Sequence, residues 1–363
     1  MLSPEDTAAE PVKPGQVSSG EGASDDASPA APKSNSLATN ANTTPEPAAG
    51  EVDDRSALLP DAPYNGSYST SIPIAVPGFR GLEPRLRLTY DSGRGLRAGG
   101  PLAGFLGTGW SLEGISSIVR ASPGRGTPRF DDKDIFLLDG EEIVRCPANA
   151  KEKAKIPSCA SGGNYMSKVE SYRRFAYSGT RKDWKVTARD GTVYVYQASG
   201  VVNPNLKGDP NLEDKYLFVL TSATDRHGNE VKYSYSCSSG AVCYPTKITY
   251  NGTYGEIRFY RDRLPAPAMS IANGGGKMGQ ISARLKTILV RTGGQNVRAY
   301  KIDYNTSSTT GSARLSRVQE FGASVVWDES GTVTGGAYLP ATTYTYSSGA
   351  LGFQASAATI AAA

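Results

Sequence analysis

Residues 82–90 read LEPRLRLTY, and the alternation of apolar and polar side chains in this stretch decides how the chain folds. The apolar side chains are those of Leu82, Leu86, Leu88 and Tyr90. An alternation with a period of two is typical of a strand with one buried face. We therefore predict a half-buried β-strand over this stretch.

The same period recurs in four further segments, each bounded by Gly, Asn, Asp or Pro. These segments are 192–197 (TVYVYQ), 230–236 (EVKYSYS), 256–261 (EIRFYR) and 299–304 (AYKIDY). Asn251-Gly252 favours a tight hairpin turn, because both residues tolerate a positive φ. The chain has 41 Gly, 23 Pro and 20 Tyr and no convincing long amphipathic helix. The sequence therefore predicts an all-β fold of multi-stranded antiparallel meander sheets.

Composition divides the chain into three parts. Residues 1–57 are rich in Ala, Pro, Ser and acidic residues, and they hold too little apolar surface to offset chain entropy. We expect a disordered leader there, a single β domain at 58–348 and an Ala-rich tail at 349–363. No apolar run approaches the ~20 residues that cross a bilayer. The first residues also lack the basic and apolar regions of a secretory signal.

Charge is distributed unevenly along the sequence. Residues 1–55 carry ten acidic and three basic side chains, which leaves 36 basic and 25 acidic side chains for the rest. The basic residues of the body stand singly along the predicted strands rather than together on one element. This spacing disfavours a nucleic-acid interface, and we expect no nucleic-acid partner.

The four cysteines form two close pairs, Cys146 with Cys159 and Cys237 with Cys243. Each pair brackets a polar, loop-like segment, so the spacing is compatible with two loop-closing disulfides and also with four free thiols. A zinc site is disfavoured, because the chain has no Cys-x-x-Cys spacing and one histidine. Disulfides would indicate an oxidising destination.

Two segments of the sequence resemble each other. Residues 189–196 and 224–235 each lead from an Asp and Gly turn into a strand with Tyr at alternate positions. Such units form either the start of a stacked repeat array or two ordinary hairpins.

The candidate catalytic and cofactor-binding motifs each lack residues or a structural setting that the chemistry requires. His227 would have to serve any Ser-His-Asp site, yet it lies in the turn-like segment 225–229 and no Gly-x-Ser-x-Gly elbow occurs. Gly93-x-Gly95 is followed by further glycines and a proline where a nucleotide-binding helix must begin. Residues 273–277 (NGGGK) lack the first Gly and the Ser or Thr of a phosphate loop. We interpret these three segments as surface turns and loops.

Two further candidates concern metal and partner binding. Asp131, Asp132 and Asp134 depart from a calcium loop at Phe136, which favours a solvated turn. Trp110 is either a partner anchor or a core residue, and the alternation around it favours the core. The sequence thus predicts no catalytic residues, no cofactor and no metal.

Motifs between residues 66 and 120 resemble the amino-terminal domain of SpvB-type virulence proteins, which B components of Tc insecticidal toxin complexes share. The motifs are GSYSTSIPIAVPGFRGLEPRLRLTYDSG (66–93) and GTGWSLEGISSIVR (107–120). The resemblance continues through Asp190-Gly191 and Arg284-Leu285 to 343–346 (TYTY), and it covers nearly all of 64–347.

The resemblance implies a mostly β module of the SpvB/Rhs type. In larger relatives this module leads into a β-propeller and an Rhs-type shell that encloses a toxic carboxy-terminal polypeptide. The present sequence stops before those parts, so we expect a stand-alone, truncated or split member. SpvB-type proteins also carry an ADP-ribosyltransferase that needs a Glu-x-Glu pair, and this sequence has none.

These observations lead to one main expectation and one alternative. We expect a non-enzymatic structural module of a secreted bacterial toxin complex, which helps to form or dock to the Rhs-type shell and is cytoplasmic before release. The alternative is a stand-alone cell-surface or glycan-binding β module that uses tyrosine-lined loops, or a truncated toxin fragment.

Overall fold

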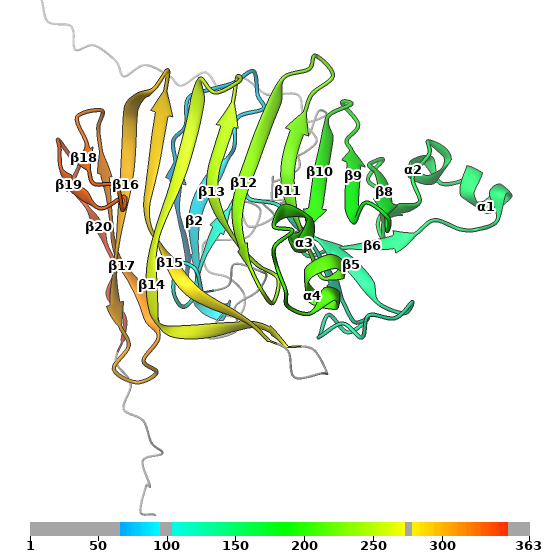
Figure 1. Ribbon diagram of the computed structural model, residues 1–363, viewed down its shortest axis with the longest axis horizontal. Helices are drawn as coiled ribbons and strands as arrows, with labels where there is room; N and C mark the ends of the chain where they lie inside the picture. Colours follow the sequence, from blue (N-terminus) through cyan, green and yellow to red (C-terminus); the bar gives the residue numbers. More distant parts are fainter. Residues whose placement is uncertain (1–65, 95–103, 273–277, 348–363) are drawn as a thin grey trace, which may run out of the picture. The chain divides into compact units, whose positions relative to one another are not determined.

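The computed structural model describes residues 66–94, 104–272 and 278–347 (Figure 1). The predicted leader (1–57) and tail (349–363) lie outside the described residues, as do Gly95 with the glycines and proline that follow it, and all of 273–277. The described chain is mostly β, which confirms the predicted fold class. Its helices are short: η2 (Ser92–Arg94), α1 (Ala150–Ala154), α2 (Pro157–Ala160), α3 (Ser199–Val202) and α4 (Pro210–Lys215).

One half of the large antiparallel sheet closes on itself. Strand β11 pairs with both β4 and β10, and the strands between them pair in sequence, so that β4 to β11 form a ring. The strands of the ring are β4 (Ser117–Ala121), β5 (Ile135–Leu138), β6 (Glu141–Arg145), β7 (Tyr165–Ser167), β8 (Arg174–Ser178), β9 (Asp183–Thr187), β10 (Val193–Ala198) and β11 (Leu217–Thr224).

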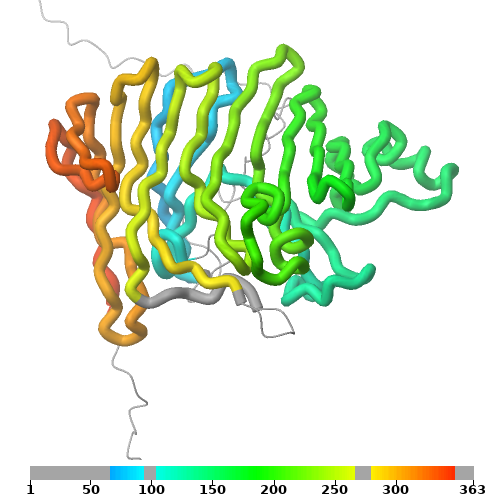
Figure 2. Tube along the Cα trace, viewed as in Figure 1, coloured from blue at the N-terminus to red at the C-terminus, as the bar shows by residue number. Residues whose placement is uncertain are grey.

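The other half of this sheet is an open meander that starts from β11, and Figure 2 shows it running from green to orange. Each strand pairs antiparallel with the next, as far as β17 and β20. Its strands are β12 (Glu230–Ser238), β13 (Val242–Tyr250), β14 (Gly255–Ala272), β15 (Met278–Thr292), β16 (Gln295–Thr306), β17 (Ala313–Phe321) and β20 (Thr342–Thr343).

Two small sheets accompany the large one. The first consists of β1 (Ser69–Ile74), β2 (Leu86–Asp91) and β3 (Trp110–Glu113), and the second of β18 (Val326–Trp327) and β19 (Val333–Gly335). The first sheet packs on one face of the meander, since Leu88 shares a buried cluster with Ile257 and Ile288. Two tyrosines join the layers: Tyr300 Oη accepts from the backbone N–H of Ala75 at 2.9 Å, and Tyr250 Oη donates to the carbonyl of Pro77 at 3.1 Å.

Aromatic side chains fill the interior of the ring. Trp184 is fully buried, and its ring centroid lies 4.8 Å from Phe136, 4.8 Å from Tyr177 and 4.9 Å from Tyr165. These rings come from β5, β7, β8 and β9, so one cluster links four strands of the ring. The ring is therefore a packed core.

All four further segments with a period of two lie in strands as predicted, namely β10, β12, β14 and β16. Asn251 and Gly252 have φ values of 53° and 66° and lie in the turn between β13 and β14. The predicted hairpin is therefore confirmed. The turn forms here because Asn and Gly tolerate a positive φ, which few other residues do.

The strand predicted over 82–90 begins later than expected. In the structure β2 starts at Leu86, and residues 82–85 form an irregular approach to it. Pro84 has no N–H to give to a sheet ladder. Glu83 instead caps the preceding turn, because its Oε2 accepts from the backbone N–H groups of Phe79 at 2.6 Å and Gly81 at 3.0 Å.

This cap makes stability depend on pH. Burial alone would raise the pKa of the Glu83 carboxyl, but hydrogen bonds from backbone N–H groups, including those of Phe79 and Gly81, outweigh burial and lower it. A lowered folded-state pKa contributes stability above the ordinary value of 4.5 and loses it as the pH falls through the folded-state value. We expect Glu83→Gln to cost about 1 kcal/mol of unfolding free energy at pH 7 and less at pH 3 in urea titrations. An equal cost at both pH values would contradict this assignment.

The two similar segments, 189–196 and 224–235, belong to neighbouring hairpins of one sheet. In the turn 188–192 the N–H of Ala188 donates to the carbonyl of Thr192, and the N–H of Gly191 donates to the carbonyl of Ala188. The turn 225–229 has the same two hydrogen bonds at the corresponding positions. The same pattern occurs at 328–332, in the separate hairpin β18–β19. The likeness is therefore that of a recurrent three-residue hairpin turn, and the two hairpins lie side by side through the pairing of β10 with β11.

Candidate interaction surface

The large sheet has one unclosed end within the described residues. The ring closes the β10 end, whereas the other end finishes at β17 and the short strand β20. Residues 337–346 run along β17, and the backbone N–H groups of Leu339 and Tyr344 donate to the carbonyls of Glu320 and Ser316, both at 2.9 Å. An unclosed sheet end is a natural place for another chain segment to dock.

Three large apolar side chains are exposed at this end. Val326 is 56% exposed, Tyr338 65% and Leu339 58%, and we call these residues the edge patch. Tyr338 lies beside the end of β17, with its ring 5.7 Å from that of Phe321. Val326 lies in β18, in the hairpin that directly follows β17. Exposed apolar side chains grouped in this way mark interaction surfaces more often than single ones do.

Trp110 anchors this end of the sheet from within. Its side chain is 3% exposed, and its ring centroid lies 4.8 Å from that of Tyr344. Trp110 Nε1 donates to Tyr346 Oη at 2.8 Å, and Tyr346 Oη donates to the carbonyl of Leu315 on β17 at 2.6 Å. The core interpretation of Trp110 is confirmed, and the partner-anchor alternative is wrong.

Glycines before Trp110 allow the backbones to meet. A Cβ atom on Gly107 would lie 2.6 Å from the carbonyl oxygen of Ala313, and Gly107 has φ +81°. The next residue, Thr108, donates its N–H to the same carbonyl at 2.9 Å. A Cβ atom on Gly109 would lie 2.6 Å from the ring of Tyr90. The Gly-x-Gly-Trp motif thus joins the small sheet to the start of β17.

The hairpin β18–β19 covers the face of the meander that the first small sheet leaves free. Val325 and Val333 share a buried cluster with Leu289, and the ring of Trp327 lies 5.6 Å from that of Tyr260. Both faces of the meander are therefore covered near the unclosed end. The edge patch is therefore held in place by the two layers that cover the meander, namely the first small sheet and the hairpin β18–β19.

The structure brings the four cysteines together as Cys146–Cys159 and Cys237–Cys243 disulfides. Cys237 lies directly opposite Cys243 in the β12–β13 ladder. The other disulfide closes the excursion between β6 and β7 that carries α1 and α2. Both bonds therefore close local loops.

We expect thiol titration of the denatured chain to find no free thiol before reduction and four afterwards. Disulfides consume all four cysteines, so free thiols should appear only when a reductant breaks them. Titration of four thiols in unreduced protein that was purified from an oxidising compartment would contradict the assignment.

Other candidates from the sequence lie apart from the edge patch. His227 is exposed in the turn between β11 and β12, which agrees with a surface histidine. The interpretation of Asp134 as part of a solvated turn is wrong, because its carboxylate is 1% exposed and accepts from Arg120 Nε at 2.7 Å. Among the described residues no acidic, Cys or His group is arranged to hold a metal ion. No described helix is long and apolar enough to span a membrane.

The tyrosines on which the alternative of a surface-binding module depends are mostly part of the core in the described residues. Tyr165, Tyr194 and Tyr196, for example, are buried in the main cluster. The strongly exposed tyrosines are Tyr68, Tyr172, Tyr254 and Tyr338. Tyr338 and Val326 were not predicted, because a short segment after the last clear alternation gives no sign of which side chains face solvent.

The family match and the curated relatives both point to SpvB proteins. The family described as Salmonella virulence plasmid 65kDa B protein, SpvB, matches residues 62–256. The mono(ADP-ribosyl)transferase SpvB of Salmonella typhimurium is 38% identical over 82 residues, which are 22% of this chain and 12% of that protein. The chain thus matches only a small part of the length of its curated relative.

Two solved structures have the same fold. The N-terminal domain of effector protein SpvB from Salmonella typhimurium strain LT2 aligns with a TM-score of 0.53 and 16% identity, over 70% of this chain and 98% of that domain. A chain of the Photorhabdus luminescens Tc holotoxin pore aligns with a TM-score of 0.53 and 18% identity, over 77% of this chain and 16% of that chain. With the family match extending over more than half of its residues, the chain belongs to the SpvB family of virulence-plasmid B proteins.

Proposed function

We propose that this chain is a non-enzymatic module of a secreted bacterial toxin complex, and that it docks to the shell-forming polypeptide of that complex through the edge patch. The single observation that carries this proposal is the exposure of Val326, Tyr338 and Leu339 at the unclosed end of an otherwise covered sheet. Membership of the SpvB family and the fold shared with a Tc holotoxin chain support the toxin-complex setting.

Pairing of the charged side chains on the strands favours a structural role over an enzymatic one. Charged groups on the strands are mostly paired across or along the sheet, as in Arg284 with Asp262 at 3.0 Å and Arg298 with Glu320 at 2.7 Å. Such pairs position strands and leave few groups for acid–base work. Release from the cell is part of the proposal, because two disulfides suit an oxidising destination.

The test is a binding assay between the full chain and the polypeptides encoded beside it. We expect an Rhs-like shell polypeptide to be retained, and retention to fall at least about tenfold for Tyr338→Asp/Leu339→Asp, since a charge placed in an apolar contact remains unpaired. The control is Val169→Asp/Tyr172→Asp, which changes two side chains that are 78% and 54% exposed on another loop. Equal retention of the two folded variants would overturn the docking surface, and retention of no neighbour would overturn the function.

A further inference from the structure

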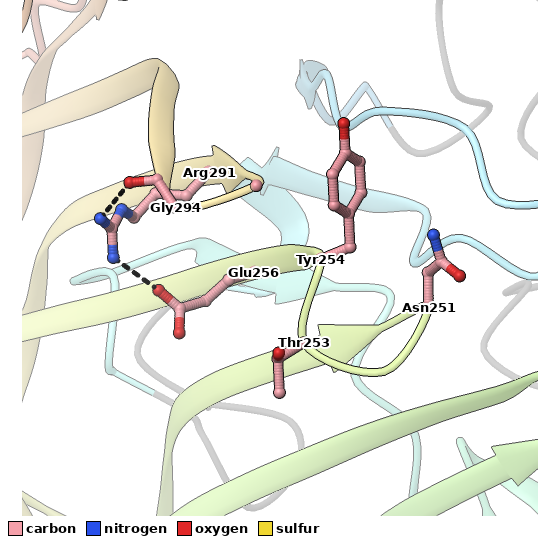
Figure 3. Close-up of a pocket in the computed structure, with 7 residues that line it drawn as sticks. Asn251, Thr253, Tyr254, Glu256, Arg291 and Gly294 are labelled. Carbon is pink, nitrogen blue, oxygen red and sulfur yellow. Dashed lines mark hydrogen bonds and ion pairs between the residues drawn. The ribbon is translucent and has the colours of Figure 1, made fainter.

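A hollow lies between two neighbouring hairpin turns of the meander. Residues 251–254 join β13 to β14, Gly293 and Gly294 join β15 to β16, and the N–H of Gly293 donates to the carbonyl of Tyr254 at 2.8 Å. The hollow has a volume of about 520 Å³, which falls in the range of small-molecule sites. Its lining consists of Asn251, Thr253, Tyr254, Glu256, Arg291, Gly293 and Gly294 (Figure 3).

One wall of the hollow is a fixed pair of charged groups. Glu256 Oε1 accepts from Arg258 Nε at 2.6 Å and from Arg291 Nη1 at 3.1 Å, and Arg291 Nη2 donates to the carbonyl of Gly294. Burial alone would raise the pKa of Glu256, but the two guanidinium groups outweigh burial and lower it. The carboxylate is therefore charged at neutral pH and holds Arg291 in place.

Arg291 still has hydrogen-bonding capacity. A guanidinium carries five N–H donors, and the bonds to Glu256 and Gly294 use two of them. Its Nε is buried and has no partner among the described residues. A ligand with acceptor oxygens would meet a rigid donor group at this wall.

The other wall is an exposed aromatic ring with polar neighbours. Tyr254 is 57% exposed, and its ring lies against Gly293, where a Cβ atom would come within 3.0 Å of the ring. For the side chains of Asn251, Thr253 and Tyr254, the described part of the chain provides no hydrogen-bond partner. Figure 3 shows Tyr254 and Asn251 across from the Glu256–Arg291 pair.

This combination points to one chemical class of ligand. A pyranose ring has an apolar C–H face that suits an exposed aromatic ring, and hydroxyl groups that suit fixed donors and acceptors. A simple anion is disfavoured, because the Glu256 carboxylate adjoins the guanidinium. An apolar ligand is disfavoured by the polar lining. We propose that the hollow binds a pyranose unit of a neutral saccharide, a function distinct from docking at the edge patch.

The test uses the full chain on an array of neutral hexose, N-acetylhexosamine and deoxyhexose oligosaccharides, followed by saturation-transfer NMR with the best-bound sugar. We expect at least one saccharide to bind and its affinity to fall at least about fivefold in Tyr254→Ala, because the stacking face is lost. Tyr338→Ala is the matched control, since Tyr338 is 65% exposed but lies in the edge patch, and binding should be unchanged.

Three outcomes would overturn the saccharide site. These are the absence of binding across the array, equal affinity of the wild type and Tyr254→Ala, and binding of inorganic phosphate in place of any neutral sugar. Circular dichroism melting of each variant excludes misfolding as the cause of a loss. Because docking is tested through Tyr338 and Leu339, failure of either proposal leaves the other standing.

Discussion

Replacing Trp184 with alanine is expected to lower the unfolding free energy by about 3–5 kcal/mol, which is much of the stability of an ordinary domain. The side chain is fully buried, and its ring contacts Phe136, Tyr165 and Tyr177 on three other strands of the ring. The cavity would be walled by strands that are closed on themselves and so relax little. Urea unfolding followed by circular dichroism measures the change.

Trp327→Ala is the matched control for this prediction. Trp327 lies in the two-stranded hairpin and is partly buried, and among the described residues its one aromatic contact is with Tyr260 of β14. We expect its loss to cost about 1–2 kcal/mol, because less area and fewer contacts are removed. If the two substitutions lowered the unfolding free energy equally, the interior of the ring of strands would not be the main hydrophobic core.

The second large effect is expected from Gly107→Ala, at about 3 kcal/mol. The added methyl group would lie 2.6 Å from the carbonyl oxygen of Ala313, and the two backbones are held together by the bridge between Gly107 and Arg314. A left-handed φ of +81° adds a further cost for any residue with a Cβ atom. The substitution should loosen the start of β17 and raise amide exchange there.

Gly81→Ala separates the cost of a positive φ from the cost of close backbone approach in Gly107→Ala. Gly81 has φ +83°, so the conformational cost is the same, but a Cβ atom there would meet nothing within 4 Å. We expect about 1 kcal/mol for this variant in the same urea titration. If Gly81→Ala destabilised the protein as much as Gly107→Ala, close backbone approach would not be the reason for the glycine.

The sequence predicted the strands with a clear alternation and the positive-φ turn at Asn251-Gly252, because those features depend on neighbouring residues. It missed the start of β2, where the Glu83 carboxylate bonds to the preceding turn. It also missed the closure of the ring, since pairing of β11 with β4 joins segments about a hundred residues apart. Closure depends on tertiary packing rather than on local pattern.

The candidate sites were less predictable than the fold. Leu339 lies within the stretch 64–347 that resembles a known family, but its exposure follows from the course of residues 337–346 along β17. Arg291 and Tyr254 lie in different hairpins and meet only because β14 and β15 are paired. Tyrosine content alone suggested binding loops, whereas most tyrosines pack in the core, where burial favours their rings.

The most direct test of the docking account is hydrogen–deuterium exchange of the full chain with and without its shell-forming neighbour. We predict slower exchange at residues 337–346 and in β18 when the neighbour is bound, with no change at 251–254. Protection confined to the ring strands, or to the turns around Tyr254, would place the interface elsewhere and contradict the edge patch as the docking surface.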